Sequence, residues 1–451
     1  MCYLYLESKL NKAITCLHFE KMTDYDLSSY TIKNKFDQIL ELPKRLGVSG
    51  PRKMKEINAA IIADTIIRRS TISRSAISQE TMLSPATVST IVDGLIAKNL
   101  VMEVGDGESS GGRRPKLLKF NFSSGCVIGV DVGGTNISGV VTNLRGEVLL
   151  RVKYPYVTSN GEGAINMLIR VIDELADGMR ENDSSVVLQG IGIGVPGLVR
   201  PNSGIVALAV NLGWKNVPLR KIISDKFQLP TFVGNDTDVA ACGEALLRNE
   251  KTINNLIYVT IGTGIGAGII IDRKLYQGSH GWVGEIGHIQ VVEDGLICKC
   301  GKRGCLETVA AGPAIAGKAL QYIRAGYGTK ILELVNGDLN QVTAEVVSTA
   351  ASQGDEVGMA IISDAGALVG KTIAYFVNFL HPDVVVIGGG VAKAGEILFK
   401  AIREKIVETS LPVMARTVKI EPSILGDDVG AAGAAALAIR QFLSNPLAGA
   451  K

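Results

Sequence analysis

Four potential metal ligands lie close together in the stretch GEIGHIQVVEDGLICKCGKRGCLE, residues 284–307. They are His288, Cys298, Cys300 and Cys305, in the pattern H-x9-C-x-C-x4-C. Three thiolates and one imidazole suit tetrahedral zinc, and four protein ligands leave no open coordination position, as in structural sites. An accidental cluster or disulfide pairing is the alternative. Because the whole chain has only four histidines and seven cysteines, their clustering favours zinc.

Two carboxylates, Glu285 and Glu307, bracket these ligands, and neither is needed to complete the zinc shell. Held on a loop that a metal ion stabilises, they are candidates for binding a small polar ligand.

The composition describes a globular, cytoplasmic protein. A length of 451 residues predicts two or three domains, and 46% hydrophobic with 20% charged residues is typical of soluble chains. The mean hydropathy of +0.24 does not indicate a membrane span. The longest uncharged run, residues 252–271, is interrupted by threonines and glycines and predicts strand, turn and strand. Glu7 makes the N-terminus a poor signal peptide. Three cysteines clustered for a metal, with Cys2, Cys16, Cys126 and Cys242 scattered, fit a reducing cytoplasm.

The basic charge is concentrated near the N-terminus. Residues 51–120 contain eleven basic and seven acidic residues, a net charge of +4 in a chain whose total is +3. Residues 1–50 show no clear period, so we expect an N-terminal extension there, and Met54 would serve equally well as a start.

A helix-turn-helix is predicted within this basic region. After an amphipathic helix over residues 57–68, Ser73 can cap a short helix over residues 74–82, and Ser84 with Pro85 can open a second one. Two short helices joined by a turn of three to four residues are typical of DNA-binding modules. The candidate DNA contacts are Arg74, Ser84, Ala86, Thr87, Ser89 and Thr90.

A wing follows the second helix. Residues 100–104 and 115–122 predict two strands joined by the tip GDGESSGGRR, which places Arg113 and Arg114 to meet phosphates or a minor groove. A three-helix packing module that binds nothing is the alternative. The basic charge and the wing favour double-stranded DNA.

Three glycine turns follow buried strands in the rest of the chain. Asp131 ends the first strand, CVIGVDV, and the turn after it consists of Gly133, Gly134, Thr135 and Asn136. The second turn contains Gly262, Thr263 and Gly264, and the third contains Gly389 and Gly390. Glycines there let backbone N–H groups approach phosphate oxygens. One such turn is a weak signal, and the repetition gives it weight.

Asn235 and Asp236 end the strand LPTFVGND, and the carboxyl ends of strands carry ligands in α/β folds. A helix cap is the alternative role for Asp236. Gly197 and Asn211 lie in loops that follow two other strands. The C-terminal segment VGAAGAAALAIRQFL predicts a closely packed helix.

Two glycine–threonine turns in separate halves resemble the duplicated clamp of the actin-like sugar kinase superfamily. More specifically, DVGGTN, GVPG, GND, GTGIGAGI, GEIGH and C-x-C-G-x-x-G-C-L-E, in this order, resemble the ROK family (repressors, open reading frames and kinases). The segment ending in GGRRPKLL resembles its repressor branch, and the resemblance covers residues 55–443. It implies an α/β fold: an extension over residues 1–50, a winged helix-turn-helix over 51–122, and a two-lobed, ribonuclease H-like sugar kinase fold with a structural zinc over 123–451.

The resemblance also implies residue roles. Asp236 would be the general base that takes a proton from a sugar hydroxyl. The sugar would be held by Gly197, Asn211, Asn235, Asp236, Glu285, His288 and Glu307. ATP and its Mg²⁺ would be held by Asp131, Gly133, Gly134, Thr135, Asn136, Gly262, Thr263, Gly264, Gly389 and Gly390. Positioning and charge neutralisation of this kind are what phosphoryl transfer needs.

We therefore expect a cytoplasmic, sugar-responsive transcriptional repressor of carbohydrate metabolism. A homodimer or homotetramer is expected, because such modules read two half-sites about one helical turn apart. The phosphate turns are intact, so the sugar domain has the residues to phosphorylate its sugar. The alternative is an ATP-dependent hexose kinase with an accessory DNA-binding module, and a zinc scaffold without ligand is a third class. The motifs do not rank glucose, N-acetylglucosamine and xylose.

Overall fold

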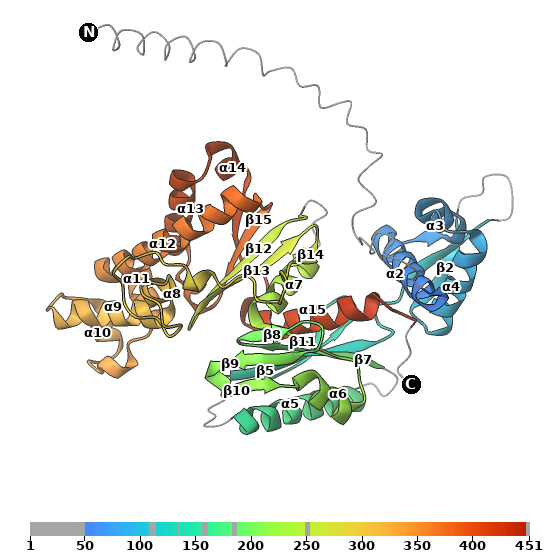
Figure 1. Ribbon diagram of the computed structural model, residues 1–451, viewed down its shortest axis with the longest axis horizontal. Coiled ribbons are helices and arrows are strands. Elements are labelled where there is room, and N and C mark those ends of the chain that lie inside the picture. Colours follow the sequence, from blue (N-terminus) through green and yellow to red (C-terminus); the bar gives the residue numbers. More distant parts are fainter. Residues whose placement is uncertain are drawn as a thin grey trace, which may run out of the picture. The chain divides into compact units, whose positions relative to one another are not determined.

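The computed structural model describes residues 50–107, 114–133, 136–155, 161–182, 187–248 and 253–447 (Figure 1). Residues 47–451 form one compact unit. The predicted N-terminal extension, the wing tip with Arg113, and Gly134 with Thr135 lie outside the described residues.

The predicted helix-turn-helix is present. Helix α2 (Pro51–Arg69) precedes α3 (Arg74–Thr81) and α4 (Pro85–Ala97). Both predicted N-caps are confirmed, since Ser73 Oγ accepts from the backbone N–H of Ala76 at 3.2 Å and Ser84 Oγ from that of Thr87 at 3.1 Å. These caps fix where α3 and α4 begin, and thereby the three-residue turn between them.

A three-stranded antiparallel sheet completes this module. Strands β1 (Ile72–Ser73), β2 (Val101–Asp106) and β3 (Lys116–Phe120) lie in the order β1-β3-β2. Strands β2 and β3 are the predicted wing. Strand β1 was not predicted, because two residues are too few to show an alternating pattern.

The first large sheet has the order β11-β7-β4-β5-β6. Strands β4 (Cys126–Val132), β5 (Asn136–Asn143) and β6 (Val148–Pro155) are antiparallel, and β7 (Leu188–Val195) and β11 (Thr231–Asn235) run parallel to β4. Helices α5 (Gly161–Asn182) and α6 (Leu219–Phe227) pack on this sheet. A small sheet inserted before α6 consists of β8 (Leu198–Arg200), β9 (Ile205–Ala209) and β10 (Trp214–Val217), with η2 (Val210–Leu212) between the last two.

The second large sheet repeats this pattern, in the order β14-β13-β12-β15-β16. Strands β12 (Leu256–Ile261), β13 (Ile265–Ile271) and β14 (Lys274–Leu275) are antiparallel, and β15 (Val384–Gly388) and β16 (Lys419–Pro422) run parallel to β12. The repeated topology confirms the predicted duplication, with one glycine turn between β4 and β5 and the other between β12 and β13.

Helices fill most of the chain from residue 307 to residue 417. After η3 (Ile286–His288) they are α8 (Glu307–Ala310), α9 (Gly312–Arg324), α10 (Lys330–Leu334), η4 (Leu339–Gln341), α11 (Ala344–Ser352), α12 (Glu356–Leu380), η5 (Gly390–Ala394), α13 (Glu396–Thr409) and α14 (Pro412–Thr417). Buried residues of α9, α11, α12 and α13 form one apolar cluster with β12, β13 and β15. Helix α12 is apolar and long enough to cross a membrane, but 56% of its most apolar window is buried inside the protein, as in a core helix.

Helices α7 (Asp236–Arg248) and α15 (Val429–Leu443, preceded by η6, Gly426–Asp428) pack against each other, α15 on the first large sheet and α7 on the second. The close packing of α15 on strands β4 and β7 and on α7 requires glycine. A Cβ on Gly129 or Gly192 would clash with the carbonyl oxygens of Ala431 and Ala434, and one on Gly243 would lie 2.8 Å from the Cα of Gly433. The prediction that the Ala/Gly-rich C-terminal helix packs closely is confirmed.

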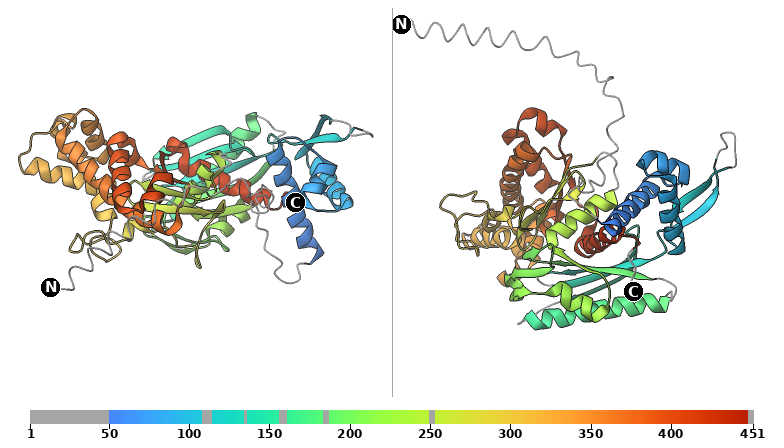
Figure 2. Two further views of the ribbon diagram at one scale, coloured as in Figure 1. Left: turned by 90° about the horizontal axis from the view of Figure 1, so that it is seen from above. Right: turned by 45° about the vertical axis from the view of Figure 1, so that its right-hand side comes forward.

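The helix-turn-helix module and the first large sheet share a buried apolar cluster. It joins Ile62, Val92 and Phe120 to Val140 of β5 and to Ala438 of α15. Helices α2 and α15 lie side by side (Figure 2). Beyond α15, the carbonyl of Leu447 accepts from Lys98 Nζ at 2.9 Å. The predicted boundary at residue 122 stays a prediction, since this cluster contains residues from both sides of it.

Candidate functional site

The four predicted metal ligands converge. The ligand atoms of His288, Cys298, Cys300 and Cys305 all lie within 4.8 Å of one another. Cys298 Sγ is 3.6 Å from His288 Nδ1, and Cys300 Sγ is 3.7 Å from Cys305 Sγ. Metal–ligand bonds of about 2.1–2.3 Å in a tetrahedron place neighbouring ligand atoms roughly 3.6–3.8 Å apart. The cluster therefore has the donor set and the spacing to bind a metal ion, and the described cysteines are free rather than paired in disulfides.

Tight turns build this cluster. Gly301 and Gly304 have φ angles of 87° and 68°, which glycine adopts more readily than any other residue. A Cβ on Gly304 would also clash with the carbonyl of Val292. Cys298 and Cys305 are buried, whereas Cys300 is exposed.

A second cluster consists of carboxylates at the ends of β4 and β11. Gly194 of β7 lies between Asp131 and Asp236, since its Cβ would be 3.3 Å from Asp131 Oδ1 and 3.9 Å from the Asp236 Cα. Burial and the neighbouring Asp236 carboxylate raise the pKa of Asp131 to about 7. Burial and, to a smaller extent, Glu285 raise the pKa of Asp236 to about 6. Such values suit a group that exchanges a proton near neutral pH.

Asp131 has an oxygen without a partner. Its Oδ1 is buried and accepts no hydrogen bond from the described residues, and its side chain packs against Gly430 in the first turn of α15, where a Cβ would clash. A buried carboxylate oxygen without a donor is costly, so this atom is suited to a ligand that supplies positive charge or a hydrogen-bond donor.

Asn235 caps α7. Its Oδ1 accepts from the backbone N–H groups of Thr237 and Asp238 at 2.9 and 3.3 Å, and its Nδ2 donates to the Gly197 carbonyl at 3.0 Å. Asp236 Oδ1 also accepts from the Thr237 N–H, at 2.8 Å. Asn235 thus makes more of the N-cap hydrogen bonds of α7 than Asp236, for which the sequence offered this role as the alternative. Its bond to Gly197 also fixes the loop that contains this glycine.

Glu285 and Glu307 connect the carboxylate cluster to the loop that contains the four candidate metal ligands, residues 284–307, which we call the metal loop. Glu285 Oε2 lies 3.8 Å from His288 Nε2, so the imidazole faces the cysteines with one nitrogen and Glu285 with the other. Burial raises the pKa of Glu285; His288 opposes this shift, and the negative charge of Glu307 adds to it. Glu307 Oε2 accepts from the backbone N–H of Ile265 at 3.2 Å, which ties α8 to the second glycine turn.

Asp238 belongs to the same cluster and was missed in the sequence. It is 6% exposed. Burial raises its pKa to about 7, with smaller contributions from Asp236 and Glu285, while a hydrogen bond from Gln277 opposes the shift. The D-x-D spacing was the available signal, but two residues along a helix do not normally share a face.

The second and third glycine turns meet. A Cβ on Gly389, whose φ is 87°, would clash with the carbonyl of Ile261, immediately before Gly262. The Gly262 carbonyl accepts from the N–H of Gly312 at 2.8 Å, at the start of α9. Cβ positions on Gly262 and Gly390 would meet nothing within 4 Å, so both backbones border open space. Thr263 and Gly264 lie between β12 and β13, and Gly264 touches Glu307.

The first turn is only partly described. The Gly133 N–H donates to the Asn136 carbonyl at 2.9 Å, which joins the two described ends of this turn. Asn136 is exposed. Asn211 is exposed in η2, two residues after Ala209, which packs against Gly197.

The predicted DNA contacts lie at the start of α4 and on the wing. Ser84, Ala86 and Thr90 are exposed, Thr87 and Ser89 are half-buried, and Arg114 is exposed beside β3. Arg74 differs from the others, because it bonds within the protein. Its guanidinium donates to Ser89 Oγ at 3.1 Å and pairs with Asp93 at 2.7 Å and Glu103 at 3.7 Å. This side chain joins α3 to α4 and to the wing.

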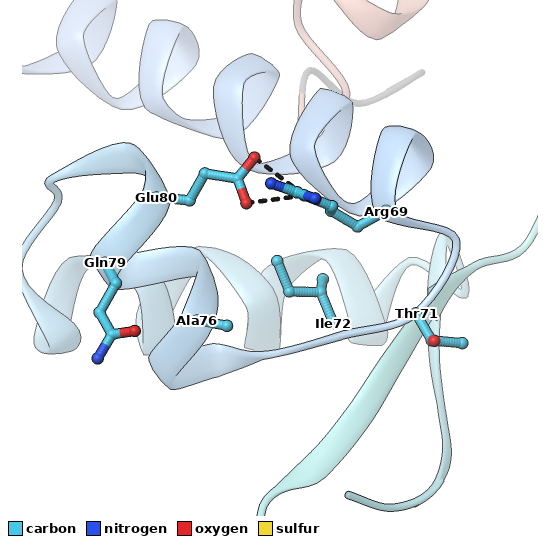
Figure 3. Close-up of a pocket in the computed structure, with 6 residues that line it drawn as sticks. All are labelled: Arg69, Thr71, Ile72, Ala76, Gln79 and Glu80. Carbon is cyan, nitrogen blue, oxygen red and sulfur yellow. Dashed lines mark hydrogen bonds and ion pairs between the residues drawn. The ribbon is translucent and has the colours of Figure 1, made fainter. Parts of the chain in front are cut away.

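A hollow lies on the same module (Figure 3), and none of the residues that line it belongs to either cluster. It is lined by Arg69, Thr71, Ile72, Ala76, Gln79 and Glu80. Arg69 Nε pairs with Glu80 at 3.0 Å across it. The hollow is explained by the junction of α2 and α3.

Comparison with known proteins gives one consistent match. The model of the ROK family matches residues 127–441. A xylose repressor of Caldicellulosiruptor bescii is 35% identical over 395 residues, which cover 87% of this chain and 98% of that protein. The crystal structure of a ROK family transcriptional regulator, a homologue of E. coli MLC, is similar with a TM-score of 0.77 and 31% identity, and covers 88% of this chain and 98% of its own. A Streptomyces griseus ROK glucokinase, solved with glucose and AMPPNP, is similar with a TM-score of 0.64 and 32% identity; it covers 70% of this chain and all of its own.

Proposed function

The chain belongs to the ROK family, and on that premise we infer that it is a sugar-responsive transcriptional repressor. One observation carries this inference: a helix-turn-helix with a wing shares a buried cluster with the sheet whose strands end at the carboxylates. The repressor relatives match both regions, whereas the glucokinase covers 70% of this chain. We also propose the domain boundaries 51–122 and 123–451, and a cytoplasmic location.

The effector is a sugar bound at the carboxylate cluster. Asp236, Glu285 and Glu307 supply acceptors, and each carboxylate can accept from two neighbouring hydroxyls. Asn235 keeps one amide hydrogen for a further bond, and His288, Gly197 and Asn211 complete the proposed set. Because a relative that is 35% identical is named a xylose repressor, xylose is the first sugar to test.

Zinc is the proposed ion of the cysteine cluster. Three thiols and an imidazole with near-tetrahedral spacing match its preference, and a complete protein shell gives it a structural role. Bound there, it would fix Glu285 and Glu307 on either side of the metal loop. His288 would then serve both clusters, as a ligand through Nδ1 and as a partner of Glu285 through Nε2.

The glycine turns fit ATP with Mg²⁺. Gly262 and Gly390 border open space, and the unpartnered oxygen of Asp131 is placed for a cation. We propose that Asp131, Gly133, Gly134, Thr135, Asn136, Gly262, Thr263, Gly264, Gly389 and Gly390 would hold the nucleotide, whose γ-phosphoryl group would be transferred. Asp236 would accept the proton of the attacking hydroxyl. A sugar kinase with an accessory DNA-binding module is therefore the second candidate.

Operator binding is assigned to α4 and the wing. The start of α4, with Ser84, Ala86, Thr87, Ser89 and Thr90, would lie in a major groove, and Arg113 and Arg114 would contact phosphates or a minor groove. Arg74, which bonds to Ser89, would orient α4 instead of reaching the DNA itself. A dimer or tetramer would place two such helices on two half-sites.

Sugar binding and ATP consumption together separate the two candidates. The purified protein is titrated with xylose, glucose and N-acetylglucosamine, and ATP turnover is measured with each, with Asp236→Asn as control. A sensor-repressor binds one sugar without turnover, whereas a kinase shows sugar-dependent turnover that the variant loses. Binding of none of these sugars would contradict the proposed effector.

A further inference from the structure

One short segment between β14 and η3 exposes two aromatic side chains. It spans residues 276–284, and we call it the aromatic loop. Trp282 is 44% exposed, and His280 is exposed as well. The other tryptophan of the chain, Trp214, is 2% exposed and donates its indole N–H to the Gly161 carbonyl at 2.7 Å. Because a tryptophan side chain is normally buried for most of its surface, the exposure of Trp282 calls for an explanation.

Hydrogen bonds fix the aromatic loop at both ends. At its start, the side chain of Gln277 donates to the buried Asp238 of the carboxylate cluster, and the Gln277 carbonyl accepts from the Gly281 N–H at 2.8 Å. At its end, the Gly284 carbonyl accepts from the N–H of Ala267 in β13 at 2.8 Å. The loop is therefore held to α7 on one side and to β13 on the other.

The middle of the aromatic loop packs on the small sheet of β8, β9 and β10. Gly281 has a φ of 80°, and a Cβ there would lie 2.6 Å from the ring of Pro201 and 2.9 Å from the Val199 carbonyl oxygen. Val199 belongs to β8, which begins directly after Gly197, and the Gly197 carbonyl accepts from Asn235 Nδ2 at 3.0 Å. The aromatic loop thus borders the proposed sugar site, and the glycine that is packed there lies between the two exposed aromatic residues.

The two exposed rings form a pair. The ring centroids of His280 and Trp282 are 5.5 Å apart, and their planes are inclined by 42°, an ordinary geometry for two aromatic side chains in contact. The face of an indole ring carries partial negative charge and attracts C–H groups. A pyranose ring has faces of C–H groups and a rim of hydroxyls, so it can stack on Trp282 and direct a hydroxyl to the imidazole of His280.

The carboxylates lie close enough to bind the same ligand. Glu285 follows Trp282 by three residues, so the Cα atoms of the two are at most about 11 Å apart. A single sugar ring held by Glu285 and Asp236 leaves the aromatic pair uncovered, whereas a second ring linked to the first covers it. Ligand sites generally combine such an aromatic wall with a few convergent polar groups.

We propose that the aromatic loop is a second sugar subsite, and that the effector is a disaccharide or a longer oligosaccharide. Its first ring binds the carboxylates, and its next ring stacks on Trp282 beside His280. The inference deepens the proposed function and rests on it, because the carboxylate cluster must bind the first ring. A single-ring sugar fills only part of the site and therefore binds more weakly.

Titration calorimetry of the full chain tests the second subsite. Xylose, glucose and N-acetylglucosamine are each compared with their β-1,4-linked disaccharide. For one of these pairs we expect the disaccharide to bind at least about tenfold more tightly, as one stacking contact with its buried area allows. Trp282→Ala is expected to bind both sugars of that pair about equally. Equal affinities in the wild type, or a preference that Trp282→Ala keeps, would overturn the proposal.

Tyr327→Ala is the matched control. Tyr327 is 58% exposed and forms a ring pair with Tyr322 at 5.2 Å between centroids, so this variant also removes an exposed ring from an aromatic pair. It is expected to keep the preference of the wild type for the disaccharide.

Iodide quenching of tryptophan fluorescence gives a second measurement that needs no variant. Because Trp214 is buried, iodide in the solvent quenches mainly Trp282. A saturating disaccharide is expected to protect Trp282 from iodide, and a saturating monosaccharide is expected to leave it accessible. If monosaccharides bind but Trp282 stays accessible with every disaccharide, the second subsite is wrong and the proposed function stands. If no sugar of either size binds, both are wrong.

Discussion

Cys300 is the one exposed residue among the four proposed metal ligands, and this makes it the most informative to change. Replacing a buried cysteine disturbs packing as well as coordination, whereas Cys300→Ser removes a ligand and little else. We expect the variant to lose bound zinc and to melt at least about 5 °C lower, since metal binding contributes to folding. Sugar affinity should fall with it, because the metal loop positions Glu285 and Glu307.

Metal analysis, calorimetry and sugar titration measure these effects. Lys299→Ser, an exposed change beside it on the same loop, controls for the substitution itself and should leave all three unchanged. Full stability and full sugar binding in metal-free Cys300→Ser protein would remove the structural role of the ion.

The buried carboxylate pair predicts a dependence of stability on pH. The pKa of Asp131 in the folded protein is about 7, above the roughly 3.9 of an unfolded chain. Because this pKa is raised by folding, the contribution of the Asp131 carboxyl group to folding stability is fully present below pH 4 and is lost as the pH rises through 7. Asp131→Asn should therefore raise the melting temperature at pH 8, without nucleotide or Mg²⁺, and change it little at pH 4.

Thermal melts at both pH values give the answer, and Asp177→Asn, on the exposed surface of α5, is the matched control. An equal effect of Asp131→Asn on the melting temperature at pH 4 and pH 8 would mean that folding does not raise the pKa of Asp131.

At the scale of elements, the wing has a testable electrostatic role. The double change Arg113→Ala, Arg114→Ala should weaken DNA binding at every sequence, and should lower the slope of log affinity against log salt by about 1–2, since each arginine that neutralises a phosphate adds about one to this slope. Fluorescence anisotropy over a salt series measures the slope. Arg180→Ala, an exposed arginine on α5, should have no effect, and an unchanged slope in the double variant would exclude the wing from phosphate binding.

How far the sequence predicted these elements depends on how local each signal is. Ser73 and Ser84 with Pro85 marked the helix starts correctly, because a cap involves only the next few residues. The strands with glycine turns were also predictable. The internal partners of Arg74 were not predictable, because its bonds to Asp93 and Glu103 depend on tertiary packing. The capping role of Asn235 was not predictable either, because the neighbouring Asn235 and Asp236 are equally good N-cap residues by type. Asp238 was missed for the same reason, since only the fold brings it near Glu285.

At the scale of the whole molecule, α15 connects the two functions. Its first turn packs on Asp131, its middle packs on α7, and the segment after it ends at α4, where Leu447 touches Gly94 and accepts from Lys98. A ligand that moves Asp131 or α7 would therefore move the end of α15 against α4, the helix proposed to read DNA. Such a shift requires that the sugar bind the two arrangements with different affinity.

Leu447→Ala should weaken this connection. We expect sugar affinity to stay unchanged, while the ratio of DNA affinities without and with sugar falls toward one. Sugar titration and anisotropy on the same variant separate the two effects. Leu332→Ala, a similar truncation of a surface leucine on α10, should behave as wild type, and normal regulation in Leu447→Ala would exclude this route.

The most direct test of a sugar-responsive repressor is DNA binding with and without sugar. Anisotropy of DNA from upstream of the protein's own gene is measured with the purified, zinc-loaded chain, first alone and then with xylose, glucose or N-acetylglucosamine. We expect specific binding that one of these sugars changes at least about tenfold, a coupling free energy of about 1.4 kcal/mol, and that Asp236→Asn no longer shows this response. Specific binding that none of them changes, or an absence of specific binding, would contradict the proposed function.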